Sequence, residues 1–212
     1  MSFMANRKCI GLLATAAMAM AGVMIPSVAS ADPDVRIDRI TLRGPACPEG
    51  TAYVEVTPDR QAFVITYDEF HASAGPGVPP QESVKGCTAL IDLDFPPGWS
   101  WTISSIAYSG SAQLDQRVAG RFSARLSFPG QRPVMKEVRM LGPTPPGGQD
   151  FDLLGDYDIF AWSPCGLKRP MTALATVQVD NSADRHRGGV VRVSQETGAF
   201  QMVFHVDWRR CR

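Results

Sequence analysis

The sequence lacks the short motifs that mark the common hydrolase and zinc-binding classes. It contains no G-x-S-x-G turn, no H-E-x-x-H pair and no C-x-x-C pair. These spacings place the nucleophile of serine hydrolases, the histidine ligands of zinc proteases and the thiolates of structural zinc sites. The three histidines, His71, His186 and His205, are too widely separated to form a short metal-binding motif. These absences favour a protein without catalytic activity.

The chain also lacks an excess of charge of either sign. Its 21 basic and 21 acidic residues give a formal net charge of zero, and the basic residues do not form a long block. Proteins that bind nucleic acids present concentrated positive charge. We therefore expect no nucleic acid partner.

Long apolar runs are absent except at the N-terminus. Arg7 and Lys8 precede an apolar run over residues 9–25, and Ala29-Ser30-Ala31 has the small-x-small form that signal peptidase cleaves. We expect residues 1–31 to be a signal peptide and residues 32–212 to form a single domain; an uncleaved anchor helix is the alternative. The expected product has no membrane span and is secreted or extracellular, or periplasmic if it comes from a two-membrane cell.

Cysteine is scarce, and its number indicates disulfides. Cys9 leaves with the expected signal peptide, so Cys47, Cys87, Cys165 and Cys211 remain. In an exported chain, four cysteines indicate a disulfide framework with three possible connectivities. We favour Cys47–Cys87 and Cys165–Cys211, one bond in each half of the chain. Zinc binding is the alternative, but it needs close pairs of ligands.

No run of helical period is long enough to predict a helix, whereas apolar residues alternate with period two in many places. In residues 86–103, Ala89, Ile91 and Leu93 share one face, and Pro96-Pro97-Gly98 suits a tight turn. We predict a β-hairpin here.

Other segments repeat this pattern. Strands are predicted over residues 37–42, 52–56, 62–67, 117–128, 173–179, 190–194 and 199–208, and loops over the Gly/Pro-rich residues 71–80 and 141–148. The strands over residues 52–56 and 62–67 are expected to pair as a hairpin. About ten strands separated by frequent turns predict an all-β fold, a two-sheet antiparallel β-sandwich that is jelly-roll-like and carries two disulfides.

Four carboxylates lie close together in Asp150, Asp152, Asp156 and Asp158. Oxygen-rich clusters of this kind suit calcium, which takes six or more oxygen ligands. The spacing matches no known calcium loop, and surface aspartates explain it equally well. Calcium is the one cofactor that we consider for this chain.

Two other groups of residues are candidates for ligand binding. Trp99 and Trp101 share a strand face beside the predicted turn, where they would stack on sugar rings if open to solvent, or form core if not. Arg117, Arg121 and Arg125 recur on the polar face of one predicted strand. They suit anionic groups of a surface polymer, or protect the sheet from aggregation.

These features leave three functions open. The first is a non-catalytic binding or surface-associated protein whose partner is an extracellular polysaccharide or a protein surface. The second is a carbohydrate-active hydrolase that uses carboxylates on a sheet face, although the sequence does not identify the pair. The third is a secreted protein inhibitor that presents the proline-rich loop over residues 75–80. The lack of a catalytic constellation favours the first.

Five blocks occur in order along the chain: G-P-A-C-P-E-G at residues 44–50, Y-D-E-F-H-A-S-A-G-P-G at 67–77, K-G-C-T at 85–88 with D-F-P-P-G-W at 94–99, W-S-P-C-G at 162–166, and D-W-R-R-C at 207–211. The chain resembles, over nearly all of its expected mature length, the secreted domain-of-unknown-function family numbered 4360. The resemblance implies an exported β protein with two disulfides. It implies no activity and no catalytic residues.

Overall fold

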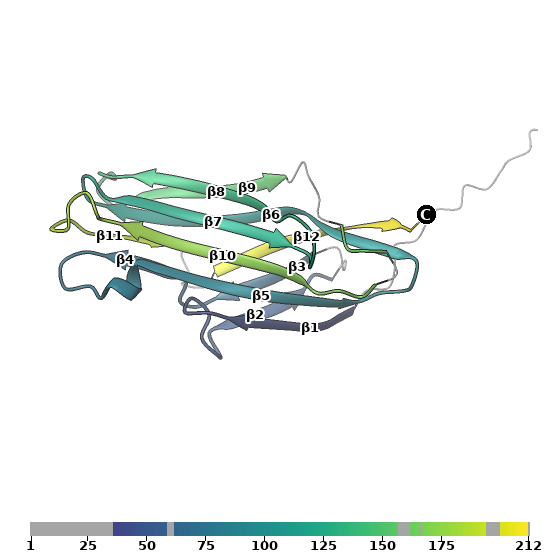
Figure 1. Ribbon diagram of the computed structural model, residues 1–212. Helices are drawn as coiled ribbons and strands as arrows, with labels where there is room; N and C mark the ends of the chain where they lie inside the picture. Colours follow the sequence, from purple (N-terminus) through teal and green to yellow (C-terminus); the bar gives the residue numbers. More distant parts are fainter. Residues whose placement is uncertain (1–35, 59–61, 157–161, 166, 194–199, 212) are drawn as a thin grey trace, which may run out of the picture. The chain divides into compact units, whose positions relative to one another are not determined.

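The computed structural model describes residues 36–58, 62–156, 162–165, 167–193 and 200–211. These residues form almost only β-strands, with one short 3-10 helix (Figure 1). The strands are β1 (Arg36–Arg43), β2 (Ala52–Val56), β3 (Ala62–Tyr67), β4 (His71–Ala74), β5 (Val84–Asp94), β6 (Trp99–Leu114), β7 (Ala119–Ser127), β8 (Val134–Leu141), β9 (Gln149–Asp156), β10 (Met171–Asp180), β11 (Gly189–Arg192) and β12 (Phe200–Arg210), and the helix is η1 (Pro80–Ser83).

The strands make two antiparallel sheets. The five-stranded sheet has the order β1-β5-β10-β7-β8, and the second has the order β2-β3-β12-β6-β11-β4, with β9 paired to β6. The chain crosses repeatedly from one sheet to the other. The predicted two-sheet antiparallel β-sandwich is confirmed, as is the predicted pairing of the strands near residues 52–56 and 62–67, which are β2 and β3.

Alternating side chains build the core between the sheets. In β10, every second residue from Met171 to Val179 is buried, so the residues between them point outward. Aromatic rings from the two sheets meet in the core: Tyr108 of β6 lies 4.6 Å from Phe122 of β7, measured between ring centroids. The inner face of the five-stranded sheet therefore packs in the core, and its outer face carries the residues that alternate with the buried ones.

The predicted hairpin over residues 86–103 is wrong, although both of its strands exist. β5 lies in the five-stranded sheet and β6 in the other, so Pro96-Pro97-Gly98 connects the two sheets instead of two paired strands. Gly98 does adopt the positive φ of +84° that the turn prediction required. The error has a physical cause, because alternation shows which face is buried but not whether the neighbouring strand pairs beside it or packs across the core.

Several other predictions need correction. β4 forms within the segment 71–80 that was predicted to be a loop, and β8 and β9 were not predicted as strands. The strand predicted from residue 117 begins only at Ala119, because Arg117 has a φ of 69° and belongs to the turn before β7. In this turn the Val118 amide donates a hydrogen bond to the Asp115 carbonyl (3.1 Å).

Both favoured disulfides are present. Cys47–Cys87 is buried and ties the β1–β2 connection to β5, and Cys165–Cys211 ties the segment after β9 to the residue after β12. Gly44 is required beside the first bond, because a Cβ atom there would lie 2.1 Å from the Gly86 carbonyl oxygen. In the part of the chain described above, no helix has the length and apolar character needed to cross a membrane.

Candidate functional site

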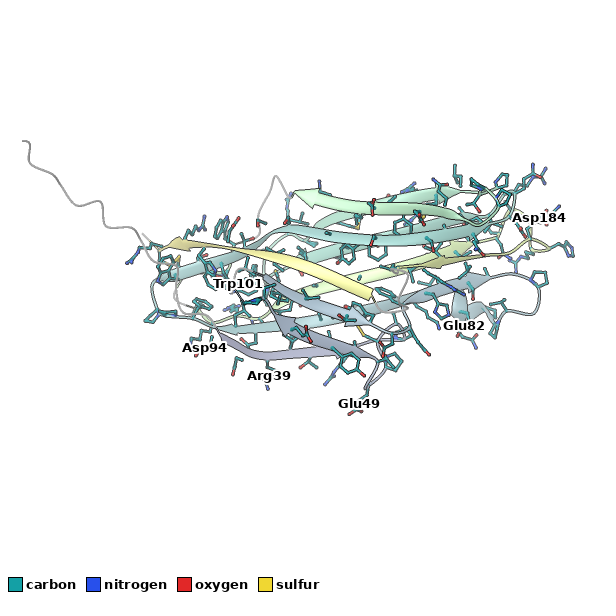
Figure 2. The ribbon with its side chains drawn as sticks, turned by 180° about the vertical axis from the view of Figure 1, so that it is seen from behind. Arg39, Glu49, Glu82, Asp94, Trp101 and Asp184 are labelled. Carbon is teal, nitrogen blue, oxygen red and sulfur yellow. A yellow bond between two sulfur atoms is a disulfide. The ribbon has the colours of Figure 1, made fainter. Side chains whose placement is uncertain are left out.

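The outer face of the five-stranded sheet carries a groove of about 540 Å³ near its β1 edge. Strand β1 contributes three side chains, β5 contributes three, and Pro170 before β10 closes one end: the lining is Arg39, Thr41, Arg43, Thr88, Leu90, Asp92 and Pro170. Leu90 is 42% exposed although it is a leucine in the middle of a sheet. Figure 2 labels Arg39 and Asp94, which mark the β1 and β5 side of this face.

Strand register aligns five outward side chains in one row across this sheet. Arg43 of β1 is opposite Thr88 of β5, which is opposite Leu174 of β10; Leu174 is opposite Arg125 of β7, and Arg125 is opposite Met135 of β8. Each of the three central residues lies between two buried neighbours on its strand, so its side chain faces solvent. We call these five residues the arginine row.

Most charged groups on this face are paired with one another. Arg39 lies 3.8 Å from Asp92, Lys168 contacts Asp94, and Glu137 lies 2.6 Å from Arg139 and 4.0 Å from Arg121. Arg43 and Arg125 differ from these groups. Within the described ranges, neither has a carboxylate within 4.0 Å.

The structure separates the two tryptophans proposed to stack on a ligand. Trp101 is 0% exposed and packs edge-on against Phe128, with ring centroids 5.1 Å apart, so the stacking hypothesis is wrong for Trp101. Trp99 is the first residue of β6 and is only partly buried. Its ring lies under the Arg210 guanidinium, 4.8 Å from the ring centroid. A binding role for Trp99 stays a prediction.

The predicted row of Arg117, Arg121 and Arg125 is only partly formed. Arg121 and Arg125 are exposed on the outer face of β7, whereas Arg117 lies in the preceding turn and is not part of the row. The arginine row instead joins Arg125 to Arg43 of β1, which was not a predicted site residue. The strand register of Arg43 with Thr88 could not be read from a single segment.

Three of the four aspartates predicted to bind calcium, Asp150, Asp152 and Asp156, belong to strand β9. Asp150 and Asp152 are exposed on the same face of the strand, opposite Ser111 and Ser109 of β6. The side chain of Asp156 and the whole of Asp158 lie outside the described residues. Among the side chains that are described, no group of three or more His, Cys, Asp or Glu residues is arranged to hold a metal ion. Calcium binding stays a prediction.

Tryptophan and arginine side chains that the sequence analysis does not predict to meet form a cluster near the C-terminal end of β12. Arg209 lies over the Trp162 ring, 4.2 Å from its centroid, while Arg210 covers Trp99. Ser163 joins this end to β6, because its amide donates to the Trp101 carbonyl (2.8 Å) and its hydroxyl accepts from the Trp101 amide (3.0 Å). Successive arginines point to opposite faces of a strand, so the two do not converge on one ligand.

The loop proposed for an inhibitor lines a smaller pocket of about 310 Å³. Its residues Gly75, Val78 and Pro79 face Asp180 and Arg185 across this pocket. The Ser182 amide donates to Asp180 Oδ1 (2.8 Å), and this hydrogen bond lowers the pKa of Asp180. The inhibitor function stays a prediction.

The environment of His71 on β4 changes its titration. Burial lowers the pKa of its imidazole, and the positive charges of Lys85 and Arg192 lower it further, against smaller opposite effects of Glu69 and Glu82. Lys85 itself is paired with Glu82 at 2.7 Å. A lowered pKa keeps His71 neutral near pH 7.

The chain is similar to a curated secreted protein. This relative is an uncharacterized secreted protein of Arthroderma benhamiae, 30% identical over 185 residues, a match that covers 85% of this chain and 74% of the relative. The expectation that this protein is secreted is confirmed by this relative.

Solved structures give only distant similarity. TmCBM61 in complex with β-1,4-galactotriose is 8% identical, with 82% of this chain and 90% of that chain covered, and a TM-score of 0.28. The family 11 carbohydrate-binding module from Clostridium thermocellum in complex with a β-1,3-1,4-mixed-linked tetrasaccharide is 9% identical, covers 80% and 90%, and has a TM-score of 0.25. TM-scores this low carry no argument about a ligand. The family described as "Domain of unknown function (DUF4360)" matches residues 33–211, so the chain belongs to this family and the resemblance drawn from its cysteine blocks is confirmed.

Proposed function

We propose that this protein, after removal of residues 1–31 as a signal peptide, is a non-catalytic binding protein of one domain that attaches to an extracellular polysaccharide. The observation that carries this proposal is the groove of about 540 Å³ on the outer face of the five-stranded sheet. The groove is a shallow site on an uncovered sheet face, which suits a long chain lying across strands better than a small molecule enclosed in a cavity.

The chemistry of the groove supports a sugar polymer. Thr41 and Thr88 supply hydroxyl groups, which both donate and accept hydrogen bonds as sugar hydroxyls do, and Arg43 supplies a planar fork of donors. Leu90 supplies an exposed apolar surface between them, against which the C–H groups of a sugar ring can pack.

Asp92 supports hydrolysis as a second candidate function. It lines the groove, and Asp94 follows two residues later on the same face, at a Cα separation of about 7 Å. Inverting glycosidases hold their two carboxyl groups about 6.5–9.5 Å apart. However, Asp92 is paired with Arg39 and Asp94 with Lys168, whereas the reaction needs one carboxylic acid that carries a proton. Binding is therefore the better-supported function.

One experiment tests both functions. The purified mature protein is incubated with a panel of soluble and insoluble polysaccharides, and bound protein and newly formed reducing ends are measured in parallel. We expect binding without release of reducing ends. Release that is abolished by Asp92→Asn would contradict the non-catalytic proposal in favour of the hydrolase.

A pair of matched variants locates the site. Leu90→Asp places a charge in the groove and should reduce binding at least about tenfold. Leu141→Asp makes the same change at the far end of β8, where Leu141 is 76% exposed, and should bind as the unmodified protein does. Equal loss in both variants, or loss in neither, would contradict the groove as the site.

A further inference from the structure

We infer that the polysaccharide is acidic and that the arginine row recognises its carboxylate or sulfate groups. This inference rests on the proposed function and adds the chemical class of the ligand. It assigns a binding role to Arg43 and Arg125 together, across four strands of the sheet.

Spacing is the first argument. Arg43 and Arg125 are separated by three strand-to-strand steps through Thr88 and Leu174, which places their Cα atoms about 14 Å apart. Both side chains are exposed and point to the same side of the sheet. A linear polymer that crosses from β1 to β7 along this row meets Arg43 and Arg125, with the hydroxyl of Thr88 and the aliphatic side chain of Leu174 between them.

Charge is the second argument. The other arginines of this face, Arg39, Arg121 and Arg139, have carboxylate partners, although Arg121 and Arg139 share the single carboxylate of Glu137. Arg43 and Arg125 have none among the described residues. A guanidinium binds a carboxylate or a sulfate through two parallel hydrogen bonds, which makes acidic sugars the complementary ligand.

The surroundings of the row are the third argument. The neighbouring rows supply mainly hydroxyl groups: Thr41, Thr172 and Ser127 lie on one side, and Thr176 and Ser123 on the other. The second of these rows ends at Glu137 of β8, whose carboxylate is paired with Arg139 and Arg121. Asp92 and Asp180 lie farther out, toward opposite ends of β5 and β10. A polyanion lying along the strands would meet these carboxylates, whereas one lying across the strands on the arginine row avoids them.

The absence of aromatic rings is the fourth argument. None of the outward side chains of the arginine row and its two neighbouring rows is aromatic, within the described part of the sheet. Stacking on indole or phenol rings therefore contributes nothing on this face. Affinity has to come from charge, hydrogen bonds and the aliphatic surfaces of Leu90 and Leu174. The part that comes from charge should fall as salt screens the arginines.

The test compares polymers that differ only in their acid groups. Binding to polygalacturonate is measured against the same polymer after chemical reduction of its carboxyl groups, and binding to dextran sulfate against dextran. We expect tight binding to at least one acidic polymer, at least about tenfold weaker binding to its neutral counterpart, and loss of binding as salt is raised. The two arms distinguish carboxylate from sulfate.

Variants assign the effect to the two arginines. Arg43→Gln and Arg125→Gln should each weaken binding to the acidic polymer by about tenfold. Arg125 does not line the groove, so Arg125→Gln should leave binding to the neutral polymer unchanged. Arg132→Gln and Arg185→Gln remove the same charge from exposed loop positions and serve as matched controls that leave binding unchanged. All four side chains are exposed, so circular dichroism should show unaltered folding.

Oligogalacturonides of increasing length test the spacing. Oligomers too short to span about 14 Å contact one arginine at a time, so each single variant leaves the other arginine able to bind them and only the double variant should lose most of the binding. In longer oligomers the two losses should combine, because both arginines are engaged at once.

The outcomes separate the two proposals. Equal binding of acidic and neutral polymers, or unchanged binding of the Arg43→Gln/Arg125→Gln protein, would overturn the acidic ligand while binding lost in Leu90→Asp would still support the groove. If none of the polysaccharides binds at low salt, both the proposed function and this inference are overturned.

Discussion

Trp99 and Trp101 show how two identical side chains on one strand face acquire different roles. Both point to the inner side of β6, but Trp101 lies under Phe128 in the core while Trp99 reaches the open end of the sandwich and meets Arg210. Sequence alternation predicts the shared face correctly. It does not show how far the core extends along the strand, and this distance decides which of the two is buried.

Truncation of these tryptophans should have unequal effects on stability. Trp101→Ala removes a fully buried ring and should lower the free energy of unfolding by about 3–5 kcal/mol. Trp99→Ala should cost less, about 1–2 kcal/mol, because the ring is partly exposed and loses only part of a core contact together with its contact to Arg210. Urea denaturation of both variants measures the difference, and similar losses would contradict the assigned core boundary.

His71 should make stability depend on pH. Burial, Lys85 and Arg192 hold its pKa below the ordinary value of 6.5 in the folded chain. Between the lowered and the ordinary pKa, the unfolded chain binds more protons, so stability should fall as pH drops from neutral through this window. Thermal melting at pH 7 and pH 5 should show a smaller decrease for His71→Gln than for the unmodified protein. An identical decrease would remove His71 as the cause.

The two disulfides differ in their exposure, and this difference should control their reduction. Cys47 and Cys87 are 3% and 1% exposed, whereas Cys165 is exposed at the end of the sandwich. A thiolate reductant needs access to a sulfur atom, so Cys165–Cys211 should be reduced at least about tenfold faster than Cys47–Cys87 under native conditions. Alkylation and peptide mass spectrometry after short exposure to dithiothreitol measure the order. Faster loss of Cys47–Cys87 would contradict the burial.

Strand β9 was not predicted, because its aspartates resemble those of a turn. Asp150, Asp152 and Asp156 alternate with apolar residues such as Phe151 and Leu153, which is a strand pattern, but a run rich in aspartate beside glycines also resembles a turn. β4 was missed for a related reason, since only four residues precede a Gly/Pro-rich loop. By contrast, β10 has uninterrupted alternation and was predicted almost to its observed ends.

The calcium prediction for Asp150, Asp152, Asp156 and Asp158 has a direct test. If these four residues hold calcium, adding calcium should raise the melting temperature and a chelator should reverse the increase. The quadruple Asp→Asn variant should lose this response. A melting temperature that is independent of calcium would contradict the site.

At the scale of the whole molecule, the sequence identifies some residues of the proposed binding face but not how the fold brings them together. Arg125 was predicted to be exposed on a strand, whereas Arg43, Leu90 and Pro170 attracted no attention, because they come from distant segments that only strand order and register bring together. The sequence also does not show which arginines have a carboxylate partner and which do not. The ion pairs of Arg39 and Arg121 depend on register between neighbouring strands, which composition does not reveal.

Hydrogen–deuterium exchange in the presence of a bound polysaccharide tests most directly whether the outer face of the five-stranded sheet is the binding surface. Peptides from β1, β5, β10 and β7 contribute to the groove and the arginine row, and their amides should exchange more slowly in the complex. Protection confined to the other sheet, to the end of β12 near Trp162, or to the loop over residues 75–80 would contradict the account.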